Sequence, residues 1–445
     1  MARAPSPLVK GFVRLALVAG AVGALAAPAG ATSVSAPTPS VALVKVQGVI
    51  DPAQVAYVEG AIRDAEAKGS TVILQIDSRG AYGMYGDEGL RLGEFVRSAS
   101  VPVVAWIGPS GARAAGASLF PVYASSLVVM APGAGIGPAE PFDLGGSVQP
   151  QDEAATAARL VAIGTQTGSS PSGVERLLRG PAEPAGTALT SGAVRVVAAD
   201  VPDLLARIDG RSVTFRFHRV TRLATLNRPD RPVDVSFHEI GIWRRILHGV
   251  STPGAVYVLL ILGVFGVAFE ITQPGFGVAG VGGAGVVALA GYGLSVIPVH
   301  WLGIALLLGG MVLMGSDVMI RRVAVLTALG TVAVAVGSVL AWHGVAPPIR
   351  VSLWLIGPAT VATFLFFGFV LTVALRSREQ VRRAQVGLVG LVGEARSDLN
   401  PEGGVYVKGT LWRARSNDGP IQAGRKVRVR AIDGLILQVE EEPGT

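Results

Sequence analysis

The chain contains no cysteine and few charged residues, and both facts limit the class of protein to which it can belong. Without cysteine it can form no disulfide, no thiol nucleophile and no cysteine-ligated zinc or iron–sulfur site. Charged residues make up 16% of the 445 positions and hydrophobic residues 50%, whereas soluble domains carry about 25% charged residues. The formal net charge of +7 comes mainly from arginine. In a membrane protein such an excess marks cytoplasmic loops and contact with anionic lipid, so we expect no nucleic-acid partner.

Five long hydrophobic segments dominate the second half of the chain. Each has close to the about 20 apolar residues that a helix needs to cross a bilayer, and the only charged residues within them, Glu270 and Asp317, lie near segment ends. A soluble bundle would show a polar stripe, and a transporter would place ionisable groups at the midplane. The sequence therefore predicts five membrane-spanning helices. The segments are residues 253–271, 281–298, 301–320, 323–342 and 351–375.

Residues 1–31 have the pattern of a signal peptide. Basic side chains occupy the first part, an apolar run covers 15–27, and Ala29-Gly30-Ala31 forms a cleavage site of the A-x-A type. An uncleaved signal anchor is the alternative, but the apolar run is shorter than a comfortable span. We therefore expect the following domain to be exported. Five spans then place the arginines after the last span on the cytoplasmic side.

Residues 41–210 alternate short strand-like runs with helical ones. Strands are predicted at 41–46, 72–76, 101–107 and 127–130, with helices at 52–67, 86–98 and 112–124. This alternation is typical of an α/β domain with a parallel sheet, in which functional sites lie at the carboxyl ends of the strands. Those ends lead into residues 77–81 and 108–118, which are therefore the candidate site loops.

Several runs along the chain resemble one known family. IDSRGA and PSGARAAGAS lie in the two site loops, VVMAPGAGIGPAEP follows them, FEITQPGFGVAGVGG lies among the first membrane segments, and VYVKGTLWRARS lies near the end. Their order resembles the long form of the NfeD family, whose members are membrane-bound, ClpP-like serine proteases often encoded beside stomatin- or flotillin-like proteins. The resemblance implies a multidomain membrane protein. Its parts are an α/β ClpP/crotonase-like domain at 41–210, a linker and juxtamembrane helix at 211–250, an all-α transmembrane bundle at 253–375 and a small all-β OB-like barrel at 384–445.

The resemblance also assigns positions to a catalytic dyad, from which this chain departs. The family's oxyanion loop has the pattern D-T-P-G-G, and here residues 77–81 read DSRGA, with Gly80 retained and Ala81 replacing the second glycine. An alanine N–H can still face an oxyanion when its φ is negative. The family's nucleophilic serine falls on Gly116, which has no side chain. Two off-register serines remain, for which helix capping or packing is the simpler explanation. They are Ser110 and Ser118.

A base for such a serine is missing as well. A serine nucleophile needs an adjacent His or Lys, and Arg159, in the helix predicted at 151–166, stays protonated and cannot serve. No lysine lies between 69 and 407, and no histidine within 41–210. We therefore interpret the exported domain as catalytically degenerate, with an active serine protease whose catalytic residues are displaced as the alternative. The glycine runs lack the Lys-Ser/Thr of a phosphate-binding loop, and we predict no cofactor and no metal.

The remaining segments predict how the protein meets its partners. A helical face at 237–247, beside Arg244 and Arg245, suits a helix at the membrane surface, although a domain-packing helix fits nearly as well. Five short strands at 384–440 predict the barrel, where Tyr406 and Trp412 are the only aromatics and protein contact is favoured over nucleic acid. We expect a multi-pass cell-membrane protein in contact with lipid. Its predicted role is that of a scaffold or partner of a stomatin-, flotillin- or prohibitin-like protein, with homo-oligomerisation left open.

Overall fold

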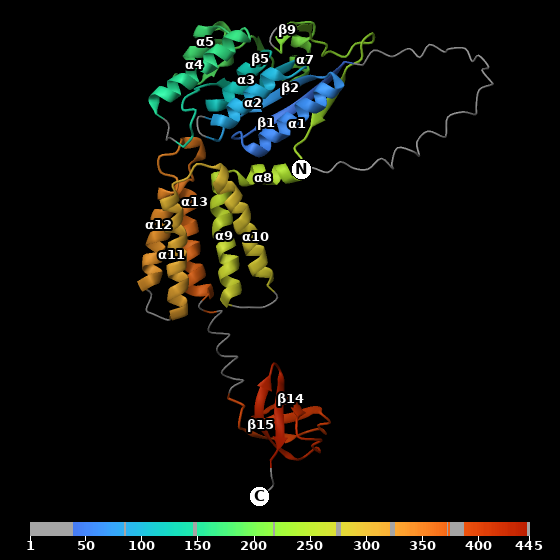
Figure 1. Ribbon diagram of the computed structural model, residues 1–445, viewed down its shortest axis with the longest axis vertical. Helices are drawn as coiled ribbons and strands as arrows, with labels where there is room; N and C mark the ends of the chain where they lie inside the picture. Colours follow the sequence, from blue (N-terminus) through green and yellow to red (C-terminus); the bar gives the residue numbers. More distant parts are fainter. Residues whose placement is uncertain are drawn as a thin grey trace, which may run out of the picture. The chain divides into compact units, whose positions relative to one another are not determined.

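The computed structural model describes residues 39–83, 86–145, 149–216, 219–272, 277–320, 325–371, 373 and 387–442. The signal peptide predicted at 1–31 lies outside these ranges, as do the arginines at 376–383 that favoured a cytoplasmic C-terminus. Within them the chain forms an α/β domain, a bundle of apolar helices and a closed β-barrel (Figure 1). The multidomain layout expected from the sequence is thereby confirmed.

The α/β domain is built on a six-stranded parallel sheet with the order β11-β1-β2-β3-β5-β8. Its central strands are rich in Val, Ile and Leu and almost wholly buried, because helices cover both faces of a parallel sheet. The strands are β1 (Ser40–Gln47), β2 (Thr71–Asp77), β3 (Val103–Ile107), β5 (Leu127–Met130), β8 (Val196–Val197) and β11 (Asp234–His238). The longer helices are α1 (Pro52–Lys68), α2 (Asp87–Ser98), α4 (Pro150–Gln166) and α7 (Val201–Ile208).

Two stretches of this domain differ from the sequence-based expectation. Residues 234–238 belong to the sheet rather than to a linker, because β11 pairs in parallel with β1 at its edge. The helix expected at 112–124 is interrupted, since Gly116 has a φ of +60°, outside the right-handed helical region. In its place the chain forms β4 (Arg113–Ala114), a 3₁₀ turn η2 (Gly116–Ser118) and the short helix α3 (Leu119–Ala124).

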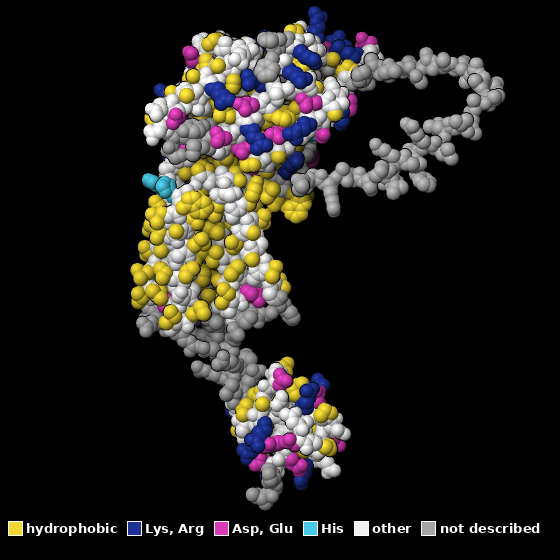
Figure 2. Space-filling model, in the orientation of Figure 1, with side chains coloured by type: hydrophobic (Ala, Val, Ile, Leu, Met, Phe, Trp, Pro, Cys, Tyr) yellow, Lys and Arg dark blue, Asp and Glu magenta, His cyan; other side chains and the backbone are white. Residues whose placement is uncertain are grey.

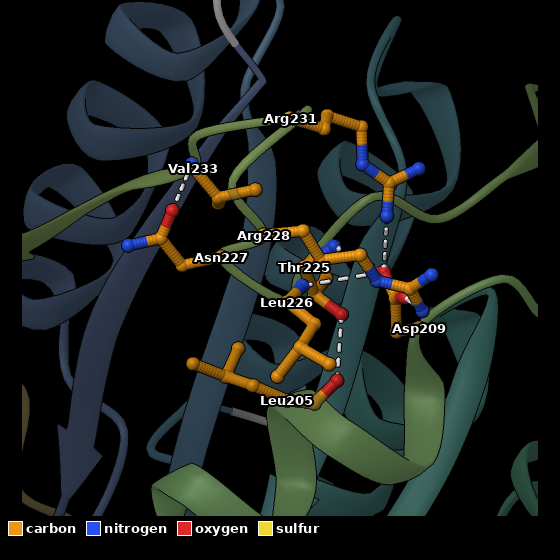
Figure 3. A network of polar contacts seen from close by, with 8 residues as sticks. All are labelled: Leu205, Asp209, Thr225, Leu226, Asn227, Arg228, Arg231 and Val233. Atoms are coloured by element: carbon orange, nitrogen blue, oxygen red, sulfur yellow. Dashed lines mark hydrogen bonds and ion pairs between the residues drawn. The ribbon is translucent and has the colours of Figure 1, made fainter.

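A buried carboxylate holds the segment that leads from α7 to β11 (Figure 3). Asp209 accepts hydrogen bonds from the backbone N–H groups of Thr225 and Leu226, at 3.0 and 3.2 Å. It also pairs with the guanidinium groups of Arg228 at 2.6 Å and Arg231 at 2.8 Å. Burial opposes its ionisation, but these donors and cations outweigh burial and lower the pKa of Asp209. The network fixes the path along which the chain returns to the sheet edge.

Within the described ranges, five apolar helices follow the α/β domain. They are α9 (Pro253–Thr272), α10 (Val278–Val296), α11 (Trp301–Ile320), α12 (Val325–Leu340) and α13 (Leu353–Leu365), which continues into a π-helical stretch at Phe366–Leu371. Four of the five, α12 excepted, are long and apolar enough to cross a membrane. Hydrophobic side chains cover much of the outer surface of the bundle, whereas charges are spread over the α/β domain (Figure 2). The chain is therefore a multi-pass membrane protein, and the count of five spans stays a prediction.

Glycines bring neighbouring helices of the bundle into close contact. A Cβ on Gly283 of α10 would lie 2.7 Å from the Val267 nitrogen and 2.8 Å from the Gly263 oxygen, both on α9. A Cβ on Gly310 of α11 would lie 2.6 Å from the Gly330 oxygen on α12. Lipid supplies no hydrophobic force between helices, so close packing at small residues holds such pairs together.

The C-terminal module is a closed five-stranded barrel with the order β12-β13-β14-β16-β15, as expected of an OB-like domain. Its strands are β12 (Val392–Ala395), β13 (Glu402–Val407), β14 (Thr410–Ser416), β15 (Lys426–Asp433) and β16 (Ile436–Glu441). Alternating apolar residues such as Val405, Ala414 and Leu437 fill the interior. Trp412 is half-buried against this core, while Tyr406 is exposed beneath the guanidinium of Arg396.

Candidate active site

The two site loops predicted from the sequence lie side by side. Ser78, directly after β2, pairs with Ala114 of β4, and its N–H donates to the Arg113 oxygen at 2.7 Å. The carboxylate of Asp77 accepts a hydrogen bond from the Arg113 N–H at 3.0 Å. Both loops leave the carboxyl ends of neighbouring parallel strands, where α/β domains place their sites. A single candidate site therefore forms between residues 77–83 and 113–118.

Gly116 lies at the start of η2, directly beside the Gly80 loop. Its N–H donates to the Pro138 oxygen at 2.8 Å, and its φ of +60° favours glycine. A Cβ here would come within 3.2 Å of the Gly80 Cα, 3.3 Å of the Arg79 oxygen and 3.5 Å of the Pro141 oxygen. The position that the family resemblance gives to a nucleophile thus has no side chain and little room for one.

Ser118 is fully buried and bonded to the backbone of both loops. Its Oγ lies 3.0 Å from the Ser78 oxygen and 2.7 Å from the Ala115 oxygen, and its single hydrogen is shared between them. The same Oγ accepts the Ala115 N–H at 3.1 Å. These bonds fasten η2 to the first loop, which is a structural task for the hydroxyl.

Ser110 lies on an exposed turn between β3 and β4. A Cβ on Gly133 would come within 2.0 Å of the Ser110 Oγ, so this hydroxyl lies directly against the turn that precedes β6 (Gly135–Ile136). The two off-register serines therefore have different surroundings. Ser118 is buried and hydrogen-bonded to backbone groups, whereas Ser110 is on the surface.

The basic side chains of the domain that the sequence singled out have other partners or face solvent. Arg159 of α4 forms an ion pair with Glu94 of α2, and about half of each side chain is exposed. Lys45 and Lys68 are exposed. Among the residues that the structure describes, no group of three or more His, Asp or Glu side chains is placed to hold a metal ion.

The fold brings two histidines to the domain that the sequence analysis placed outside it, His238 at the end of β11 and His248 beside α1. His248, from the juxtamembrane helix α8 (Ile242–Val250), places Nδ1 2.9 Å from the Oδ2 of Asp51, which is fully buried and precedes α1. The hydrogen bond to Asp51 raises the pKa of His248, and the Gln47 oxygen, a second acceptor, adds to this against the effect of burial. Both acceptors favour a doubly protonated ring, so His248 is poorly suited to act as a base in this state. No local sequence pattern links residues 197 positions apart.

Two acidic side chains at the start of α2 have raised pKa values. For Asp87 burial is the main cause, and the negative charge of Asp143 adds to it. For Glu88 burial again dominates, with Arg91 opposing the shift and the carboxylate of Asp51 supporting it. Both side chains lie in the first turn of α2, where the helix dipole favours the ionised form and therefore opposes these shifts.

Leu144 covers the Gly80 loop and ties it to the membrane bundle. A Cβ on Gly80 would come within 3.2 Å of both Leu144 methyl groups, and the Leu144 oxygen accepts the Ala346 N–H at 2.8 Å. Leu144 is buried in one apolar cluster with Val345 and Ile349, from the segment between α12 and α13. The candidate site is therefore closed where the α/β domain meets the membrane helices.

The fold and site define an integral membrane protein that joins an α/β domain with a parallel sheet to a small β-barrel. Family comparison agrees with this division. The NfeD integral membrane domain matches residues 255–372, and the NfeD-like C-terminal, partner-binding domain matches residues 386–441. The chain therefore contains both NfeD domains, and its layout is consistent with the long form of the NfeD family.

Similar proteins cover much of the chain. The membrane-bound protease PH1510 of Pyrococcus horikoshii is 27% identical over 392 residues, which is 83% of this chain and 86% of that protein. The solved structure of 1510-N, a membrane protease specific for a stomatin homolog from the same organism, is 20% identical and covers 48% of this chain and 98% of its own, with a TM-score of 0.41. The ClpP catalytic domain of Plasmodium falciparum is 12% identical over 35% of this chain and 83% of its own, with a TM-score of 0.28.

Proposed function

We propose that this protein is a membrane scaffold whose ClpP-like domain has lost proteolytic activity and whose barrel binds a stomatin-type membrane protein. The observation that carries the first half is the geometry of Gly116. A serine protease needs a hydroxyl facing its oxyanion loop and a base beside that hydroxyl. Here the backbone of the Gly80 loop fills the space in front of Gly116, and no side chain extends from it.

The loss of activity is tested by labelling the full chain, in detergent, with a serine-directed fluorophosphonate. We expect no labelling, because removal of a nucleophile leaves only about 10³–10⁴-fold catalysis over water from binding and the oxyanion loop. Labelling that disappears in Ser110→Ala or in Ser118→Ala would refute the proposal. It would also identify the displaced nucleophile.

An active protease with displaced residues is the second candidate, and two observations favour it. The relative from Pyrococcus horikoshii is named a protease, and the fold brings His248 to a domain that has no histidine of its own within residues 41–210. This candidate requires a hydroxyl near a deprotonated base. The fluorophosphonate experiment at pH 8.5, well above the ordinary pKa of an imidazole, decides between the two proposals.

A groove on the barrel supports the partner-binding half of the proposal. It has a volume of 360 Å³ and lies along β13 and β14, with Leu411 and Trp412 as its apolar part and Glu402 and Arg413 as its charged part. Leu411 is 61% exposed and lies beside the half-buried Trp412, so the groove presents apolar surface to solvent. An apolar centre with a charged rim is typical of a surface that binds another protein.

The binding half is tested by purifying the full chain from membranes together with a co-expressed stomatin-type protein. Leu411→Asp places a charge in the groove and should abolish co-purification. Leu435→Asp is the matched control, since Leu435 is 75% exposed on the turn between β15 and β16 and outside the groove. If both variants retained the partner equally, the groove would not be its binding site.

We also propose that the α/β domain is extracytoplasmic and the barrel cytoplasmic. The signal-like residues 1–31, five apolar helices and the arginines after them support this orientation. A phosphatase reporter fused after Gly210 should be active and one fused after Thr445 inactive. The opposite result for the second fusion would require an even number of spans.

A further inference from the structure

The juxtamembrane helix α8 has two chemically different sides. Its polar side faces the α/β domain: His248 pairs with Asp51, and the Arg244 guanidinium lies 3.7 Å from where a Cβ on Gly60 of α1 would be. Arg245 forms an ion pair with Glu239 at 3.3 Å. At about 100° per residue, these three side chains occupy one half of the helix circumference. The α/β domain thus holds α8 by its polar side.

The apolar side of α8 points away from the domain and is largely uncovered. Trp243 is 74% exposed, and Ile242 and Ile246 on the same side are exposed as well. The stripe ends at Val250, which is buried against α10, where a Cβ on Gly293 would lie 2.9 Å from the Val250 oxygen. The uncovered stripe therefore runs directly into the contact with the membrane bundle.

Exposed tryptophans mark the same end of the bundle. α8 ends at Val250 and α9 begins at Pro253, while α10 ends at Val296 and α11 begins with the exposed Trp301. α13 also begins at this end, because a Cβ on Gly254 would lie 3.6 Å from the Leu355 side chain, and there Trp354 is 91% exposed. Tryptophan is enriched at the level of the lipid headgroups, where its ring is apolar and its N–H can be hydrated.

We propose that α8 lies in the headgroup region of the bilayer, with Ile242, Trp243 and Ile246 inserted toward the acyl chains at the level of Trp301 and Trp354. Lipid is the occupant that the position selects, because the stripe continues into helices that are themselves surrounded by lipid. An amphipathic helix with a tryptophan and arginines is typical of such a location. Held by His248 on one side and by lipid on the other, α8 sets the height of the α/β domain above the membrane.

The absence of cysteine allows a direct test. Single cysteines replace Trp243 or Ile246 in the full chain, carry a nitroxide spin label, and are reconstituted into phosphatidylcholine and phosphatidylglycerol vesicles. Accessibility to oxygen, which dissolves in lipid, is compared with accessibility to a water-soluble nickel chelate. Leu262→Cys, at an exposed position within α9, is the lipid reference, and Val220→Cys, at an exposed position on β10 (Arg219–Arg222), is the aqueous reference.

Labels at 243 and 246 should show an oxygen-to-nickel accessibility ratio between those of the two references and well above that of residue 220. A ratio equal to that of residue 220 would overturn the proposal, because the stripe would then face water. Dipolar broadening at 243 that disappears on dilution with unlabelled chain would overturn it too, since a second copy would then be the occupant. Reference labels that keep their expected ratios show that the variants are folded and inserted.

Discussion

The ion pair between His248 and Asp51 is the contact whose removal should most weaken the junction of α8 with the α/β domain. Asp51 is fully buried, and besides His248 its carboxylate accepts the Gln54 N–H at 2.7 Å, as the N-cap of α1. In His248→Ala the buried carboxylate keeps only this capping bond. Removing one partner of a buried ion pair costs about 3–5 kcal/mol. Because His248 is 24% exposed and water can enter the vacated space, we expect about 2–3 kcal/mol.

The same pair makes the junction sensitive to pH, with a definite sign. Bonding to Asp51 raises the pKa of His248 in the folded protein above its ordinary value of 6.5. Stabilisation from a raised histidine pKa is fully present below the unfolded value, about pH 6.5, and is lost as pH rises through the folded value. Arg244 and Arg245, the other charged side chains of α8, do not reverse this sign, since a guanidinium stays protonated throughout this range.

Hydrogen exchange of the full chain in detergent measures the effect where it arises. Protection factors of the first turn of α1 and of α8 should fall between pH 6 and pH 8.5 in the parent chain. They should be lower and nearly independent of pH in His248→Ala. His343→Ala, at an exposed histidine between α12 and α13, is the control. Undiminished protection of α8 in His248→Ala would show that the pair does not hold the junction.

Three further substitutions test the remaining structural arguments. Gly116→Ser should lower the free energy of unfolding by about 1–2 kcal/mol, because a side chain is strained at a φ of +60°. It should gain no fluorophosphonate labelling, because, among the residues that the structure describes, no base lies beside the new hydroxyl. Gain of labelling would contradict the absence of such a base. Asp209→Ala should speed proteolysis between α7 and β11 at pH 7. The difference should begin to shrink below about pH 4 and be lost only as pH falls through the lowered pKa of Asp209 in the folded protein. Gly283→Val should lower the thermal stability of the bundle, because its Cβ would lie 2.7 Å from the Val267 nitrogen. Gly282→Ala should leave the thermal stability unchanged, because nothing lies within 4 Å of the added Cβ. Equal thermal stability of the two variants would refute close packing at Gly283.

Sequence patterns predict the parts of this fold whose cause is local. The apolar segments of the bundle follow from hydrophobic length alone, and α1 follows from Asp51 as N-cap with Pro52 behind it. The Gly80 and Gly116 loops come together because both follow neighbouring parallel strands. In these cases a few adjacent residues determine the structure.

The features that the sequence did not reveal depend on contacts between distant residues. β11 has only five residues, and its strand character comes from pairing with β1, whose Leu43 lies opposite Phe237. The helix expected at 112–124 contains good helix formers, but the left-handed backbone of Gly116 is set by its place between the site loops. The approach of His248 to Asp51 likewise appears only once α8 is docked on α1.

The pairing of β1 with β11 also bears on how the chain is made. Domains fold as they are synthesised, from the N-terminal side, and an unpaired edge strand is prone to aggregation. In this protein β1 keeps an open edge until the ribosome has passed His238, and α9 begins at Pro253, only a short stretch later. Completion of the sheet and insertion of the first apolar helix therefore fall in the same brief interval of translation. Because β11 precedes α9 in the chain, slow insertion of α9 would hardly prolong the exposure of the β1 edge. A stall before residue 234, by contrast, would leave this edge open to pairing with other chains.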